Sequence, residues 1–137
     1  MELLAREVAR ARRYARPLSL ILGRPKGEGG LAGDVMAQGW MALARDVDFG
    51  ARLDDLRWAM ALPETGRAGA SVAAERFRRG LETLSGTGSC PVTLGVVTHP
   101  YHGTSATALL DSADNLSRQT DSTVAVAEFP KPGGDTL

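Results

Sequence analysis

The residues of this 137-residue sequence that could carry out chemistry lie mainly between positions 45 and 55. Arg45 and Asp48 stand three residues apart, a spacing that places two side chains on one side of a helix. Such a pair could form a surface ion pair worth about 0.2–0.5 kcal/mol, or it could bind a ligand through its donors and acceptors. Asp54 and Asp55 are adjacent carboxylates, the usual ligands of the metal ions that assist phosphoryl transfer. Aspartate is also common in tight turns, so this second pair has a structural explanation as well.

The other candidates for metal or nucleophilic chemistry are isolated in the sequence. His99 and His102 flank Pro100-Tyr101, and no third ligand is evident near them, so we interpret both as exposed loop residues. Cys90 is the only cysteine, which excludes an internal disulfide and a CxxC metal-binding motif. No His or other base stands beside it in the sequence, so we expect an inert thiol.

The composition is that of one ordinary globular domain, with 43% hydrophobic and 23% charged residues. Sixteen basic and 16 acidic residues cancel, so the chain has no overall basic field to attract DNA or RNA. Only two of the basic residues are Lys, and Arg is the better donor for bidentate recognition of phosphates and base edges. No apolar run is long enough for a membrane span, and the first 16 residues lack a signal peptide's apolar stretch. We therefore expect a cytoplasmic protein with no membrane insertion.

Hydrophobic periodicity and turn residues predict alternating helices and strands. The helices are expected at 2–14, at 34–44 with Trp40 on an apolar face, after Pro63-Glu64-Thr65, and at 104–119. The strands are expected at 18–22, 47–53, 57–62, 91–98 and 122–129, with a Gly-rich loop at 23–33. Thr65 would cap the third helix, whose core face would hold Ala70, Ala73, Phe77, Leu81 and Leu84.

A hairpin between the second and third strands means that the sheet cannot be all parallel. The sequence therefore predicts an α+β fold, with helices over a mixed or antiparallel sheet. Residues 1–129 are expected to form the domain, and the Pro- and Gly-rich segment 130–137 is expected to be a disordered tail.

The segment from Arg52 to Thr65 resembles the signature hairpin of GGDEF domains, the catalytic domains of diguanylate cyclases. In that family, Arg and an aromatic residue precede Gly-Gly-Asp-Glu-Phe, four mostly apolar residues and Pro-Glu-Thr; here the segment is Arg-Leu-Asp-Asp-Leu-Arg-Trp-Ala-Met-Ala-Leu-Pro-Glu-Thr. Further segments are similar to other parts of the family in the same order: 10–20, 74–78, 91–94 and 109–114. The resemblance covers residues 3–127 and implies a nucleotidyl-cyclase-like, five-stranded, mostly antiparallel sheet flanked by helices.

The positions that would carry the family's chemistry hold other residues. The family takes one acidic metal ligand from the end of its first strand, where this chain has Gly23-Arg24-Pro25-Lys26. The signature itself has become Asp54-Asp55-Leu56-Arg57-Trp58, so Leu and Arg replace its two acids and side chains replace its two glycines. Cations at these positions would repel a divalent metal, and the lost glycines would keep a phosphate from the backbone.

Two more parts of the catalytic apparatus have no counterpart. The family's nucleotide-binding loop is reduced to residues 27–32, and the phosphate-binding Lys of its last helix is missing near Arg118-Gln119. Asp54 and Asp55 could imitate the lost acids, but their partner ligand is absent. The resemblance therefore implies a degenerate domain that is not an enzyme and needs no cofactor and no metal, and an active cyclase is the least favoured hypothesis.

A different feature of the family, its inhibitory site for cyclic di-GMP, is retained in the sequence. In many GGDEF domains an Arg-x-x-Asp stands before the signature at the offset of Arg45 and Asp48, and the next helix adds an Arg at the position of Arg76. A guanidinium can bind O6 and N7 of guanine or a phosphate, and a carboxylate accepts from N1–H and N2–H. Three such residues could give micromolar affinity, about 8 kcal/mol. Arg52 and Arg79 are candidate accessory residues.

Two functions remain open at this stage. The first is a cyclic di-GMP receptor that regulates a partner protein, by analogy in exopolysaccharide synthesis, secretion or biofilm formation. Because the family often binds this ligand as a pair between two copies, the partner can also be a second copy in a ligand-dependent dimer. The alternative is a protein–protein scaffold that binds no nucleotide, in which Arg45 and Asp48 form only an ion pair and Arg76 belongs to a solvated helix face.

Overall fold

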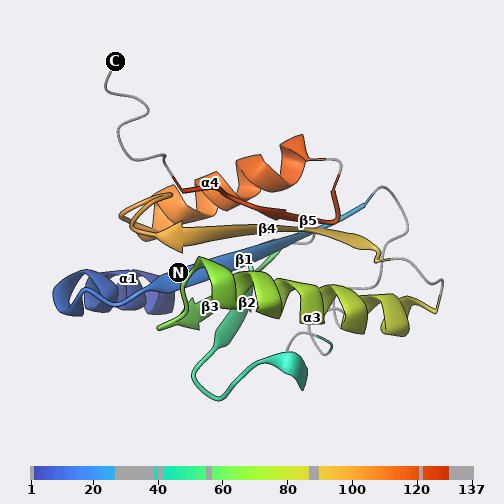
Figure 1. Cartoon of the computed structure of the whole chain (residues 1–137), viewed down its shortest axis with the longest axis horizontal. Helices are drawn as coiled ribbons and strands as arrows, with labels where there is room; N and C mark the ends of the chain where they lie inside the picture. The colour runs from blue at the N-terminus through green and yellow to red at the C-terminus, as the bar shows by residue number, and fades with distance from the viewer. Residues whose placement is uncertain are drawn as a thin grey trace.

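A computed structural model describes residues 2–26, 39, 42–54, 57–86, 90–120 and 122–129. Within these residues the helices are α1 (Glu2–Tyr14), α3 (Arg67–Ser85) and α4 (Ala106–Gln119). The strands are β1 (Leu18–Pro25), β2 (Phe49–Arg52), β3 (Trp58–Pro63), β4 (Val92–His99) and β5 (Val124–Val126), as Figure 1 shows. None of the described helices is both long and apolar enough to cross a bilayer.

The five strands form one mixed sheet in the order β2-β3-β1-β4-β5. The pairs β2–β3, β3–β1 and β1–β4 are antiparallel, and β4–β5 is parallel. The predicted hairpin is confirmed, because β2 pairs with β3 and Arg52 lies opposite Trp58 beside the turn. The expectation of a mixed, mostly antiparallel sheet is therefore confirmed.

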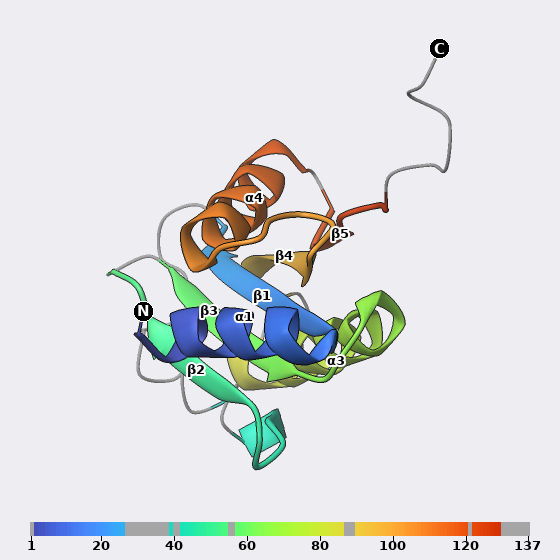
Figure 2. The ribbon, with the colours of Figure 1, turned by 90° about the vertical axis from the view of Figure 1, so that its left-hand side faces the viewer.

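Helices cover both faces of the sheet (Figure 2). On one face, α3 packs against alternating residues of the central strands, such as Ile21, Met60 and Val96. On the other face, α1 and α4 pack against Leu20, Leu22 and their neighbours. Because helices bury the central strands from both sides, β3 and β4 are buried at every residue, as their continuous apolar runs require.

Three local expectations were wrong. Residues 23–25 continue β1 instead of starting a loop, because Arg24 and Pro25 pair with Thr93 and Val92 of β4. The N-cap of α3 is Gly66, without a side-chain cap bond, and the Thr65 hydroxyl instead donates to the Pro63 carbonyl over 3.1 Å.

The third wrong expectation concerns the face that α3 buries. The buried residues of this helix are Ala70, Ala74, Phe77 and Leu81. Ala74 is fully buried on this face, where it was not expected, whereas the expected Ala73 is only partly buried and packs against the edge of the same core. Leu84, in the last turn, remains 47% exposed.

Some expectations fall outside the described residues. Of the helix expected at 34–44, only residues 39, 42 and 43 are described as helical, whereas Ala44 is not helical. The described part of the chain does not include Trp40, residues 27–33 of the expected loop or the tail 130–137.

Candidate functional site

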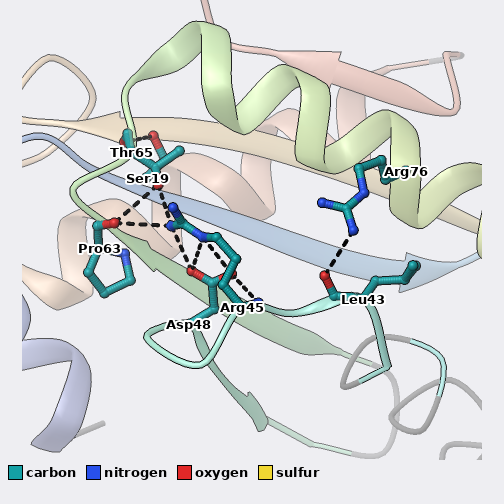
Figure 3. Close-up of polar contacts among 7 residues, drawn as sticks. All are labelled: Ser19, Leu43, Arg45, Asp48, Pro63, Thr65 and Arg76. Atoms are coloured by element: carbon teal, nitrogen blue, oxygen red, sulfur yellow. Dashed lines mark hydrogen bonds and ion pairs between the residues drawn. The ribbon is translucent and has the colours of Figure 1, made fainter.

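Arg45 and Asp48 face each other across a tight turn that leads into β2 (Figure 3). The turn closes through a hydrogen bond from the Asp48 backbone N–H to the Arg45 carbonyl, 3.0 Å long. The Asp48 carboxylate accepts from the Arg45 backbone N–H at 2.8 Å and from its Nη2 at 2.9 Å. The three-residue spacing therefore brings the pair together through a turn and not, as expected, on a helix.

Arg45 also ties this turn to the start of α3. Its Nη2 donates to the Thr65 hydroxyl at 2.7 Å and to the Pro63 carbonyl at 3.2 Å (Figure 3). The Arg45 side chain is 52% exposed, whereas that of Asp48 is only 4% exposed. The hydrogen bond that Arg45 donates to Asp48 raises the pKa of the guanidinium above its ordinary value, so Arg45 is a permanent cation. Asp48 is thus a buried support for an arginine whose outer side faces solvent.

A pocket of about 140 Å³ lies between this turn and α3. Arg45, Asp48 and Arg76 all line it, together with Leu43, Leu62, Thr65, Gly69, Val72, Ala73 and Phe77. Arg76 is exposed and donates to the Leu43 carbonyl over a long 3.5 Å (Figure 3). The volume is below the roughly 300–1,000 Å³ of common ligand pockets, so only part of a larger ligand could enter. The structure therefore brings the three predicted site residues to one small concave surface.

The two candidate accessory residues are not part of this surface. Arg52 lies at the turn end of β2, where its guanidinium stands 5.8 Å from the centre of the Trp58 ring and its Nε donates to the Asp54 carbonyl. Arg79 is an exposed residue of α3, one turn beyond Arg76. Neither residue lines the pocket.

The end of β1 that would carry a metal ligand in the family carries an arginine cluster instead. Arg24 of β1, Arg57 just before β3 and Arg118 of α4 all form ion pairs with the carboxylate of Asp114. Nη1 of Arg57 lies 3.3 Å from Oδ1, and Nη2 of Arg118 lies 3.0 Å from Oδ2. The Asp114 side chain is only 12% exposed.

Burial alone would raise the pKa of the Asp114 carboxyl. The hydrogen bond that Arg24 donates and the positive charges of Arg24 and Arg118, together with a hydrogen bond from Arg57, outweigh burial and hold that pKa below its ordinary value. Sequence reasoning gave this residue no role. The only local signal was the i,i+4 spacing of Asp114 and Arg118 on one helix face.

The remaining acids and histidines of the described residues do not gather into a metal centre. Asp54 is held by Arg57, whose Nη2 lies 2.8 Å from its Oδ2, and Asp55 lies outside the described residues. Within the described ranges, no group of three or more His, Cys, Asp or Glu side chains could hold a metal ion.

The expectation that His99 and His102 are exposed was wrong. His99 ends β4 and is 4% exposed, and its burial, with the charge of Arg12, lowers its pKa. Nδ1 of the half-buried His102 accepts from the Thr98 backbone N–H at 2.8 Å. Cys90 is buried, which raises the pKa of its thiol and agrees with an inert cysteine.

Comparison with known proteins identifies the fold. No protein-family model matches the chain, and no curated protein matches it by sequence. Solved structures do match. The GGDEF domain of PA1120 (YfiN or TpbB) from Pseudomonas aeruginosa is 24% identical, with a TM-score of 0.73 over 93% of this chain and 92% of that one. The active GGEEF domain of a diguanylate cyclase from Vibrio cholerae is 17% identical, with a TM-score of 0.77 over 94% of both chains.

A third similar structure contains a ligand. The GGDEF domain of DgcB from Caulobacter crescentus, solved in complex with c-di-GMP, is 19% identical, with a TM-score of 0.72 over 91% of this chain and 86% of that one. The chain therefore has the nucleotidyl-cyclase-like α+β fold of GGDEF domains, as the signature hairpin predicted.

Proposed function

We propose that this chain is a non-catalytic receptor for cyclic di-GMP, which it binds through Arg45, Asp48 and Arg76. The observation that carries the proposal is the common pocket of these three side chains, at the offset before the hairpin that the resemblance to GGDEF domains gives for the inhibitory site. A GGDEF domain with this fold has been solved with the same ligand, which supports the choice of ligand.

Each of the three residues has a distinct part in the proposed binding. The exposed side of the Arg45 guanidinium donates to O6 and N7 of a guanine base. Asp48 already accepts bonds from Arg45, so its first task is to hold that guanidinium in one orientation. Arg76 is exposed, and its bond to the Leu43 carbonyl is long at 3.5 Å, so this weakly held guanidinium can turn to pair with a ligand phosphate. The second guanine and the rest of the ligand lie outside the small pocket.

The proposed lack of catalysis is supported by the cluster around Asp114. Metal ions at phosphoryl-transfer sites need carboxylate oxygens, and here Arg24 and Arg57 occupy the positions that would supply them. The carboxylate that is present is already paired with three guanidinium groups. A divalent cation would have to displace these cations from their partner. We therefore propose that the domain needs neither a metal nor a cofactor and forms no product from GTP.

The proposed output of ligand binding is a contact with another protein or with a second copy of this chain. By analogy with degenerate relatives, the pathway is exopolysaccharide synthesis, secretion or biofilm formation in the cytoplasm of a bacterium. Val47 in the turn of Arg45 and Asp48 is 61% exposed, and Val72 on α3 is 63% exposed, so both can offer apolar contacts to that partner.

Isothermal titration calorimetry with cyclic di-GMP tests this function. The wild-type chain should release or absorb heat with micromolar affinity, and Arg45→Ala, Asp48→Asn and Arg76→Ala should each weaken binding about tenfold or more. Arg79→Ala is the matched control, because Arg79 is exposed on the same helix but does not line the pocket. Unchanged affinity in Arg45→Ala would overturn the proposed site.

The same preparation separates the other functions. The absence of heat in the folded wild-type chain would favour the protein–protein scaffold, for which the exposed Val47 and Val72 are the relevant observation. Cyclic di-GMP formed from GTP and magnesium would contradict the proposed loss of catalysis.

A further inference from the structure

A second pocket, of about 640 Å³, lies on the other side of the segment that starts α3. It is bounded by the end of α1, the start of α3, the connection between β4 and α4, and the residues after β5. Its lining residues include Arg12, Arg16, Arg67, His99, Tyr101 and Phe129. None of its lining residues also lines the pocket of Arg45, so an inference about this pocket does not rest on the proposed function.

The charge of this pocket is positive. Three arginines line it, and no Asp or Glu is among its described lining residues. Arg16 forms an ion pair with Glu64, with 3.8 Å between its Nε and the Glu64 Oε1. Both of these side chains are largely exposed. Since exposed pairs at this distance neutralise little charge, the pocket presents an excess of cations to a ligand.

Two of the arginines are held in place by the fold. Nη2 of Arg12 donates to the Thr104 carbonyl at 2.7 Å, and Nε of Arg67 donates to the Ala127 carbonyl at 3.0 Å. A guanidinium has five N–H donors, so Arg12 and Arg67 each keep further N–H groups that can donate to an anion. Anchoring also reduces the entropy that binding would cost.

Another part of the pocket lining is aromatic. The rings of Tyr101 and Phe129 stack with centroids 4.1 Å apart and planes inclined by 23°. Tyr101 is 54% exposed and Phe129 is 39% exposed, so this stack leaves flat apolar surface open at the pocket. The guanidinium of Arg67 lies 5.9 Å from the Phe129 ring centre, which places the cationic and the aromatic surfaces next to each other.

We propose that this pocket is a second ligand site, which binds a small organic phosphate that carries an aromatic ring. The phosphate pairs with Arg12 and Arg67, and the ring stacks on Tyr101. A phosphate suits three nearby cations better than a carboxylate does, because it carries more negative charge and more acceptor oxygens. The volume lies within the range of roughly 300–1,000 Å³ that is common for sites of such ligands.

AMP is the probe, and the amide spectrum of the ¹⁵N-labelled full chain is the readout, which also reports whether each variant is folded. Millimolar AMP should shift the amides of Gly66, Arg67, Thr98 and Tyr101. Arg12→Gln, Arg67→Gln and Tyr101→Ala should each weaken binding about tenfold. Arg13→Gln is the matched control, because Arg13 is exposed on the same helix as Arg12 but does not line the pocket.

Adenosine and inorganic phosphate, which carry only one part of the probe each, should bind at least about tenfold more weakly than AMP. The inference would be overturned by an unshifted spectrum, by shifts confined to the pocket of Arg45, or by equal affinity for AMP and either fragment. Arg45→Ala should leave AMP binding at this pocket unchanged, so this site and the cyclic di-GMP site can fail separately.

Discussion

Asp48 and Asp114 are both buried, and each carboxylate forms ion pairs with arginine side chains. Asp48 holds one arginine at the edge of a pocket, and Asp114 holds three at the end of the sheet. A carboxylate that loses its charge in such a place no longer offsets the charge of the guanidinium groups paired with it. At the scale of single residues, these two acids are therefore where substitutions have the clearest consequences.

Replacement of Asp114 by Asn should destabilise the domain. The substitution removes the charge that Arg24, Arg57 and Arg118 share, and we expect a loss of about 1–3 kcal/mol in the free energy of unfolding, because the arginines keep part of their hydration. Urea unfolding measures this loss. Asp111→Asn, at an exposed position one turn earlier on α4, is the control and should leave the midpoint unchanged. Equal midpoints for both variants would contradict the structural role of Asp114.

The stabilisation by Asp114 should depend on pH. The folded-state pKa of this carboxyl is lowered, so the unfolded chain binds more protons in the acid range and the stabilisation is complete above the unfolded pKa of about 3.9. As the pH falls through the lower folded pKa, the stabilisation is lost. The difference in unfolding free energy between wild type and Asp114→Asn should therefore be constant near neutral pH and shrink below about pH 4. A difference that grows on acidification would show that the sign is wrong.

At the scale of the elements, the packing of α4 on β4 limits what the strand can carry. A Cβ atom at Gly95 would stand 2.7 Å from the Ala113 carbonyl oxygen and 3.4 Å from Cβ of Ser117. Since the first of these neighbours is backbone, the helix would have to move to admit a side chain. The glycine thus lets α4 approach the sheet closely enough for Ala113 to be fully buried.

Gly95→Ala should therefore destabilise the protein by about 1–3 kcal/mol, although alanine suits a strand better than glycine does. Thermal unfolding followed by circular dichroism measures the effect. Unchanged or increased stability would mean that α4 can shift at little cost, and it would contradict the close packing inferred here.

At the scale of the whole molecule, the segment from Pro63 to Arg67 joins the two pockets. Thr65 accepts from Arg45 on one side, and its carbonyl accepts from the Ser19 hydroxyl, which also bonds to Thr98 beside the second pocket. The arginine cluster of Asp114 lies at the opposite end of β1, which pairs Leu18 with Pro63 at one end and carries Arg24 at the other. The two proposed binding surfaces and the arginine cluster of Asp114 are thus separated along the sheet.

If the ligand is bound as a pair between two copies, cyclic di-GMP should change the oligomeric state. We expect the sedimentation coefficient of the wild-type chain to rise on addition of the ligand, because a dimer forms around it. Arg45→Ala should show no such rise at the same ligand concentration, and Arg79→Ala should behave like the wild type. Binding of the ligand without any change in the sedimentation coefficient would contradict the ligand-dependent dimer and leave a different protein as the partner.

Local sequence was sufficient for much of this protein. The signature hairpin and the helices around residues 2–14 and 104–119 depend on neighbours in the chain, so periodicity and turn residues predicted them. The three-residue spacing also predicted that Arg45 and Asp48 meet, although through a helix and not through the turn that the structure shows. Tertiary contacts decided the rest. Arg24 meets Asp114 across 90 residues of sequence, β1 extends to Pro25 only because β4 lies beside it, and His99 is buried because helices cover β4. Such contacts depend on which distant segments the sheet brings together, and a local sequence pattern does not contain this information.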